Sequence, residues 1–180
     1  MKLTCRGFEV KELNVATGVF SGYASTWDQD LYGDVVVKGA FTNTLEQDFP
    51  VGGAHIPIHW QHQDNNTTDI IGETLNAVED EHGLLVTARL DTDIPEGQRA
   101  YELLKRGLIH QMSIGFIPTK TAWVDQSGQS GDPFDGYREI REVKLFEISL
   151  VQVAANQGAE VLEVKSGRVL SAANEEKLRN

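Results

Sequence analysis

Three side chains in separate segments of the chain carry the groups that nucleophilic acyl transfer requires. His62 closes a histidine-rich stretch, Ser113 lies in an apolar segment, and Glu147 interrupts the apolar run 143–151. A hydroxyl, an imidazole and a desolvated carboxylate are the components of a Ser-His-acid site. The order along the chain is His, Ser, acid, and the Gly-x-Ser-x-Gly elbow of α/β-hydrolases does not occur.

The histidine-rich stretch 55–64 is compatible with two local structures that imply different functions. On a helix, the histidines at positions 55, 59 and 62 would share one face and would form a metal site. Pro57 would lie in the second turn, which disfavours that helix. On a strand, alternation places His62 on one face with Ile56, Ile58 and Trp60, and places His55, His59 and Gln61 on the other.

The strand interpretation separates the histidines, so we expect no metal. No Walker or dinucleotide fingerprint occurs, so we expect no other cofactor. It leaves His62 as the polar end of an apolar row. There it is either a hydrogen-bonded residue at a strand end or a general base. A metal-dependent hydrolase that uses His55, His59 and Asp64 is the alternative that keeps the metal.

Ser113 and Glu147 also have structural alternatives. Ser113 is either a nucleophile or a small core residue bonded to a main-chain carbonyl, and Gly115 beyond it permits the close approach of a backbone or a substrate carbonyl. A carboxylate in an apolar strand is costly unless a charged group or a good donor meets it. For Glu147 that partner is either a histidine whose ring it orients or an arginine, Arg138 or Arg141.

Short strands with a few helices are expected to position these groups. The strand candidates are rich in Val, Ile and aromatic residues and are bounded by Gly, Asp and Asn; they are 19–25, 34–37, 56–62, 71–78, 84–90, 108–116 and 143–151. Residues 71–90 form a hairpin whose turn is 80–83. Segment 125–137 has the composition of a solvated loop.

Two helices are predicted between the strands. Segment 40–48 carries a narrow apolar stripe. Segment 95–106 starts at Pro95, has Asp93 as a candidate cap, and stops at Gly107, which supplies a left-handed residue. Its expected core side chains are Tyr101, Leu104 and Leu108.

The charge balance and the cysteine content exclude several classes of protein. The 16 Lys and Arg against 27 Asp and Glu give a net charge of −11, and phosphate binding needs clustered cations. Cys5 stands alone, which excludes an intrachain disulfide and a Cys-based zinc finger. No run approaches the roughly 20 apolar residues of a membrane span. We therefore expect one soluble domain with neither a nucleic-acid nor a membrane partner.

An ordered set of short motifs resembles the HK97-type phage prohead proteases, which mature capsids. The motifs are Gly22-Tyr23-Ala24-Ser25, Gly33-Asp34-Val35-Val36, Gly39-Ala40-Phe41, Trp60-Gln61-His62, Ile71-Gly72, His82-Gly83-Leu84, Met112-Ser113-Ile114-Gly115-Phe116, Leu145-Phe146-Glu147-Ile148-Ser149-Leu150-Val151 and Ala155-Asn156. They run from about Phe8 to Val164, nearly the whole domain. One departure is Ala154, where the family often has proline.

The resemblance implies a serine endopeptidase with an α+β, mainly β fold: a closed or partly closed β-barrel ringed by a few helices, similar to herpesvirus assemblin. It places the histidine base on His62, the nucleophile on Ser113 and the third catalytic member on Glu147. Assemblin-like relatives use a second histidine as the third member, so His59 or His110 is the alternative there. Main-chain N–H groups near Ser113 and Ile114, or a strand opposite, would stabilise the oxyanion.

The resemblance also implies a substrate, an assembly and a location. The substrate is the scaffold segment of the major capsid protein, and the enzyme is a homo-oligomer, a dimer or larger, inside the assembling prohead in the host cytoplasm. We expect the protease domain over 1–165 and a polar tail over 166–180, flexible or starting a longer helix. The alternative from another class is a non-catalytic β-barrel module for capsid assembly or scaffolding.

Overall fold

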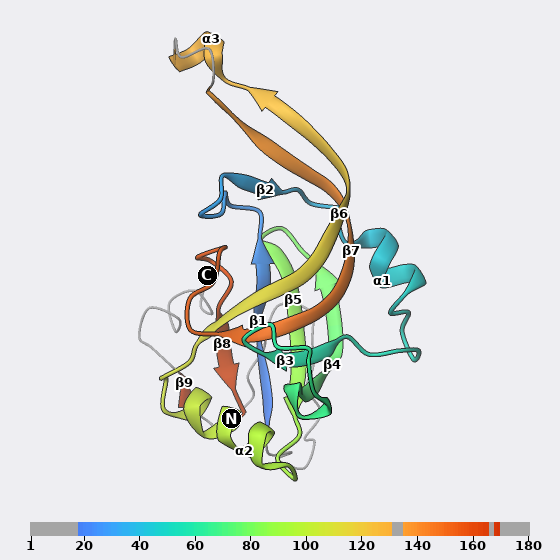
Figure 1. The fold of residues 1–180 in the computed structure, drawn as a ribbon, viewed down its shortest axis with the longest axis vertical. Coiled ribbons are helices and arrows are strands. Elements are labelled where there is room, and N and C mark those ends of the chain that lie inside the picture. The colour runs from blue at the N-terminus through green and yellow to red at the C-terminus, as the bar shows by residue number, and fades with distance from the viewer. Residues whose placement is uncertain (1–17, 131–134, 166–167, 170–180) are drawn as a thin grey trace.

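The computed structural model describes residues 18–130, 135–165 and 168–169, which form one nine-stranded sheet with short helices around it (Figure 1). The strands are β1 (Val19–Thr26), β2 (Asp34–Val36), β3 (Pro57–Trp60), β4 (Ile70–Glu79), β5 (Gly83–Leu90), β6 (Gln111–Asp125), β7 (Gly136–Val151), β8 (Val161–Val164) and β9 (Arg168–Val169). The helices are α1 (Thr42–Gln47), η1 (Thr67–Asp69), α2 (Pro95–Lys105) and α3 (Ser127–Ser130). Within these residues no helix is long and apolar enough to span a membrane.

Strand β7 organises the part of the sheet that matters for chemistry. β2 and β3 both run parallel to β7 along one edge, and β6 runs antiparallel along the other edge. From β3 the sheet continues through β4, β5, β1 and β8 to β9 with antiparallel pairing. The segments predicted to carry the imidazole, the acid and the hydroxyl are therefore the neighbouring elements β3, β7 and β6.

The fold is mainly β with few helices, as predicted, but its strand ladder does not close into a barrel. β2 and β9 are the terminal strands of the pairing path. The sheet nevertheless curls until the start of β6 touches the start of β8. There an isolated bridge joins Gln111 to Glu160, and the Met112 N–H donates to the Ala159 carbonyl at 2.9 Å. The strand pairing therefore leaves the predicted closed or partly closed barrel unconfirmed.

The hairpin predicted over 71–90 is confirmed, and its second strand shows why the pattern was informative. β5 alternates, and its inward residues Leu84, Val86, Ala88 and Leu90 are all buried. The turn closes through the Asp80 N–H, which donates to the Gly83 carbonyl at 2.9 Å. Because alternate side chains of a strand point to one face, four apolar residues at spacing two give one continuous core surface.

Helix α2 begins and ends near the predicted positions, with two differences. Its N-cap is Ile94 in an extended conformation, and no side chain caps it, so the prediction for Asp93 is wrong. Gly107 has φ +68°, as expected for a helix stop, but Leu108 is 56% exposed and Ile109 is buried in its place. The left-handed residue turns the chain, which moves the next apolar position off the helical stripe.

Strands β6 and β7 continue beyond the sheet body as a two-stranded arm that ends at α3 (Figure 1). The predicted strand 108–116 therefore begins later, at Gln111, and runs on to Asp125. Pro118 is accommodated beside a register shift in the β6–β7 pairing, where a missing N–H costs little. Of the predicted tail, 166–180, only β9 lies within the described residues, so its boundary stays a prediction.

Candidate active site

One face of β7 and β6 carries the acid and the hydroxyl. Glu147 and Ser149 are two positions apart on β7 and point to the same side. In the β6–β7 register, Ser113 lies opposite Ser149 and Gly115 lies opposite Glu147. Directly opposed residues share a face, with Cβ atoms about 5 Å apart. The register thus makes Ser113 a cross-strand neighbour of Ser149 and a diagonal neighbour of Glu147.

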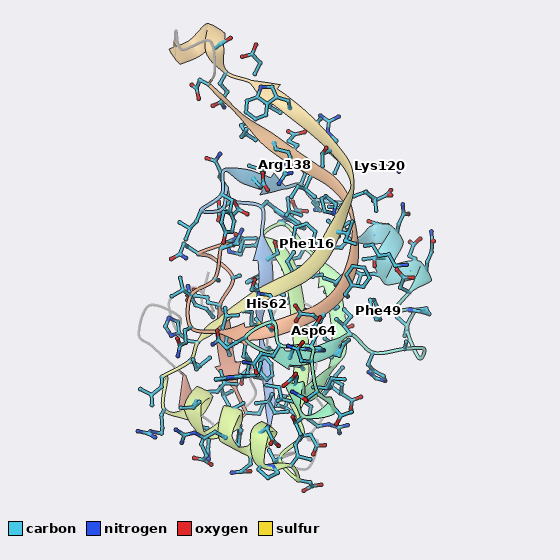
Figure 2. The ribbon with its side chains drawn as sticks, in the orientation of Figure 1. Phe49, His62, Asp64, Phe116, Lys120 and Arg138 are labelled. Carbon is cyan, nitrogen blue, oxygen red and sulfur yellow. The ribbon has the colours of Figure 1, made fainter. Side chains whose placement is uncertain are left out.

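A left-handed turn brings the imidazole to this face. β3 ends at Trp60, and the next two residues, Gln61 and His62, have φ values of 54° and 57°. Such a conformation costs a non-glycine residue about 1–2 kcal/mol, so other contacts must stabilise it. The prediction that His62 continues the apolar face of β3 is wrong, because the strand stops before it. His62 instead lies beside β6 and β7, where the two strands cross the sheet body (Figure 2).

The imidazole and the carboxylate form a hydrogen-bonded pair. His62 Nδ1 lies 2.6 Å from Glu147 Oε1, and the two side chains are 42% and 12% exposed. The hydrogen bond that His62 donates to Glu147 raises the pKa of His62 above its ordinary value; partial burial opposes this effect, and the negative charge of Glu147 adds to it. An ionised carboxylate only accepts hydrogen bonds, so Nδ1 carries the proton and Nε2 keeps a lone pair that faces away from Glu147.

Neither Arg138 nor Arg141 reaches Glu147. The Arg138 guanidinium donates to the carboxylate of Asp34, and that of Arg141 donates to Glu139. The carboxylate in the apolar strand is therefore matched by a histidine, the first of the two partners that the sequence allowed.

The other histidines named as candidates for the site are placed elsewhere. His55 Nδ1 lies 2.6 Å from the carbonyl of Thr74, and His59 Nδ1 lies 2.6 Å from the carbonyl of Gln63. His110 precedes β6 and accepts a main-chain hydrogen bond from Val161. Neither His59 nor His110 takes the place of Glu147 beside the His62 ring. Among the residues that the structure describes, no group of three or more His, Cys, Asp or Glu could hold a metal ion.

Ser113 and Ser149 face each other but differ in accessibility. Ser149 is 0% exposed, and its hydroxyl bonds to both Glu147 and the main chain of His62. Ser113 is half-buried, and within the described part of the chain its hydroxyl makes no hydrogen bond, either to a main-chain carbonyl or to His62. Catalytic hydrogen bonds are often long before substrate binds. Of the two serines, only Ser113 offers an accessible hydroxyl.

Gly115 makes room for the acid. A Cβ atom at this position would lie 2.2 Å from Glu147 Oε1 and 2.8 Å from its Cδ. The close approach predicted for this glycine is therefore made by a carboxylate, whereas the sequence suggested a backbone or a substrate carbonyl.

We expect Gly115→Ala to displace the Glu147 carboxylate from His62 and to lower activity about 10- to 100-fold, with a smaller loss of stability. The rate of serine labelling by a fluorophosphonate, measured beside the melting temperature, checks this. Gly128→Ala is the matched control, because nothing lies within 4 Å of an added Cβ there. Equal labelling rates for the Gly115 variant and the wild type would contradict the role of this glycine.

Sequence reasoning missed two features of the site. The left-handed turn at Gln61 and His62 has only a weak local signal, because histidine is enriched in this conformation but neither residue is a glycine or an asparagine. Ser149 points the same way as Glu147, which alternation alone shows, but its contact with the main chain of His62 joins positions 87 apart and depends on the packing of β3 against β7.

The comparison with family profiles agrees with the motifs. The sequence profile of the caudovirus prohead serine protease family matches residues 7–173. A Kaposi's sarcoma herpesvirus protease, solved with a hexapeptide phosphonate inhibitor, is similar at a TM-score of 0.48 and 16% identity, over 81% of this chain and 64% of that one. Varicella-zoster virus protease is similar at a TM-score of 0.45 and 15% identity, over 89% of this chain and 74% of that one. This chain thus spans less than two thirds of the first of these proteins, and no curated protein sequence matches it.

Proposed function

Because the chain belongs to the caudovirus prohead serine protease family, we propose that it is a serine endopeptidase that cleaves the scaffold segments of capsid proteins. It acts as a homo-oligomer inside the assembling prohead, in the host cytoplasm. The observation that carries this proposal is the 2.6 Å contact between His62 Nδ1 and Glu147, on the face of the sheet where Ser113 presents an unbonded hydroxyl.

Ser113, His62 and Glu147 take the same roles as in other Ser-His-acid hydrolases. His62 Nε2 takes the proton of Ser113 Oγ, and the oxygen attacks the scissile carbonyl carbon. The protonated imidazole, stabilised by Glu147, then gives its proton to the departing amine and leaves an acyl-enzyme. Water, deprotonated by the same imidazole, attacks the ester carbonyl and releases the acid product and the Ser113 hydroxyl.

The main-chain N–H of Ile114 is the proposed donor to the oxyanion. Along a strand, successive N–H groups point to opposite edges. The Met112 N–H points away from β7, since it donates to the Ala159 carbonyl, and Ile114, two residues on, points to the same edge. Beyond the isolated bridge between Gln111 and Glu160, no described strand pairs with β6 along that edge, so this N–H is available to a substrate. We further propose that the curled sheet acts as a partly closed barrel that holds this edge in place.

The raised pKa of His62 sets the acidic limb of the curve of labelling rate against pH. Only the neutral imidazole accepts the Ser113 proton, so the labelling rate falls as the pH drops through that pKa. We expect the half-maximal rate above pH 6.5, the ordinary value for histidine. A pH series of fluorophosphonate labelling measures it, and Glu147→Gln should move the midpoint down, because it removes the interaction that raises the pKa. A wild-type midpoint at or below the ordinary value would contradict this.

Cleavage of a capsid protein that carries its scaffold segment tests the function. The purified chain, in each oligomeric state it forms, is incubated with that protein, and the products are mapped by mass spectrometry. Cleavage between the scaffold and shell segments supports the proposal. An intact substrate and an unlabelled serine in every state would favour the non-catalytic assembly module.

A further inference from the structure

The Ser149 hydroxyl lies at the junction of the acid and the base. It accepts the main-chain N–H of His62 at 2.9 Å and lies 2.8 Å from Glu147 Oε2. The other oxygen of the same carboxylate contacts the His62 ring at 2.6 Å. His62, Ser149 and Glu147 therefore form a closed ring of hydrogen bonds that starts and ends on one histidine.

The direction of each hydrogen bond in this ring follows from its chemistry. A main-chain N–H can only donate, so Ser149 Oγ accepts from His62. The one hydroxyl proton of Ser149 is then free to go to Glu147 Oε2. With Oε2 occupied as an acceptor, Oε1 is turned to the ring and accepts from Nδ1. Both branches of the ring thus run from His62 to Glu147, one directly from Nδ1 and the other from the main-chain N–H through the Ser149 hydroxyl.

The same hydroxyl supports the turn that carries the histidine. Because β3 ends at Trp60, the N–H of His62 lies outside the strand ladder and needs another acceptor. Ser149 supplies it from β7, the strand that also carries Glu147. The hydroxyl is 0% exposed, so water does not replace it as a partner when it is removed.

We propose that Ser149 is a positioning residue: its hydroxyl holds the left-handed turn of His62 and the Glu147 carboxylate in one geometry and so selects the Nδ1–H tautomer of the imidazole. This inference rests on the proposed function for the same site and adds a residue to it. Ser149 itself does not touch the substrate, because it is fully buried and its one hydroxyl proton is already donated to Glu147.

The ring-nitrogen chemical shifts of His62 test the proposal in the unmodified protein. In isotope-labelled wild type, at a pH above the pKa of His62, they should show the Nδ1–H tautomer. In Ser149→Ala the two tautomers should mix and the pKa should move toward its ordinary value. A wild-type ring protonated on Nε2, or a spectrum unchanged by Ser149→Ala, would overturn the proposal.

Labelling of the active serine by a fluorophosphonate gives the second readout. Ser149→Ala should label about 10- to 100-fold more slowly than wild type, because a buried donor and acceptor lose their partner. Ser149→Thr keeps the hydroxyl and a strand-compatible shape, and it should recover most of the rate. Ser25→Ala is the matched control, since Ser25 is also buried on a strand and its hydroxyl makes only a 3.4 Å contact with the Thr26 carbonyl.

The two readouts separate this proposal from the function on which it rests. If wild type does not label but the His62 tautomer depends on Ser149, the proteolytic function is wrong and the positioning role stands. If wild type labels and Ser149→Ala labels equally fast with an unchanged ring spectrum, the positioning role is wrong and the function stands.

Discussion

Ser113→Ala should abolish labelling by a fluorophosphonate and reduce peptide cleavage about 10⁵- to 10⁶-fold. Of the two serines that face each other beside Glu147, the variant lacks the accessible one, because Ser149 is fully buried. A methyl group fits where a half-buried hydroxyl stood, so the fold should persist. Intact-mass spectrometry after labelling, together with cleavage of the capsid substrate, measures the effect.

The control for this variant is Ser21→Ala. Ser21 is likewise a half-buried strand residue, and its hydroxyl pairs with Thr87 at 3.2 Å. It should label and cleave like wild type. Cleavage by Ser113→Ala at the wild-type rate would show that another group is the nucleophile, and the mechanism would then be wrong even if the chain is a protease.

Glu147→Gln should lower the cleavage rate about 10²- to 10⁴-fold, less than the loss of Ser113. The amide has one acceptor and one donor where the carboxylate has two acceptors. If its oxygen accepts from the Ser149 hydroxyl, its NH₂ group faces His62 Nδ1 and favours the tautomer with the proton on Nε2. If its oxygen faces His62, the Ser149 proton loses its acceptor. In either orientation, the charge that stabilises the imidazolium is gone.

The matched control is Glu142→Gln, on the same strand. Glu142 is paired with Lys120 and Thr119 away from the site, and an exposed ion pair contributes only about 0–1 kcal/mol. Its cleavage rate should be close to that of wild type. A Glu147→Gln rate as high as that of Glu142→Gln would mean that Glu147 neither orients nor stabilises the imidazole.

Several elements were predictable because their signals are local. The β4–β5 hairpin followed from alternation in 84–90 and a turn at 80–83, and α2 followed from Pro95 and the stop at Gly107. The exposure of Leu108, which was expected in the core, was not predictable in this way. It depends on where the chain goes after a left-handed residue, and only packing against the rest of the molecule settles that.

In the site, too, what depends on local signals was predictable and what depends on distant contacts was not. An acid in an apolar strand can be recognised from the sequence, because a buried carboxylate needs a partner. This requirement selected Glu147 and limited its partner to a histidine or an arginine. It did not choose between them. The choice depended on Asp34 and Glu139 engaging the arginines and on a turn that carries His62 across to β7.

The amino-acid sequence alone determined which groups are present, the mainly β class and the family, since residue types, periodicity and ordered motifs are properties of the chain. The tertiary structure decided that the imidazole meets the acid 85 positions away, and that one serine is enclosed while its cross-strand neighbour is accessible. The reason is geometric: hydrogen bonds and burial depend on strand register and on the hand of a single turn. Those are fixed by contacts between distant segments, and neither segment by itself determines them.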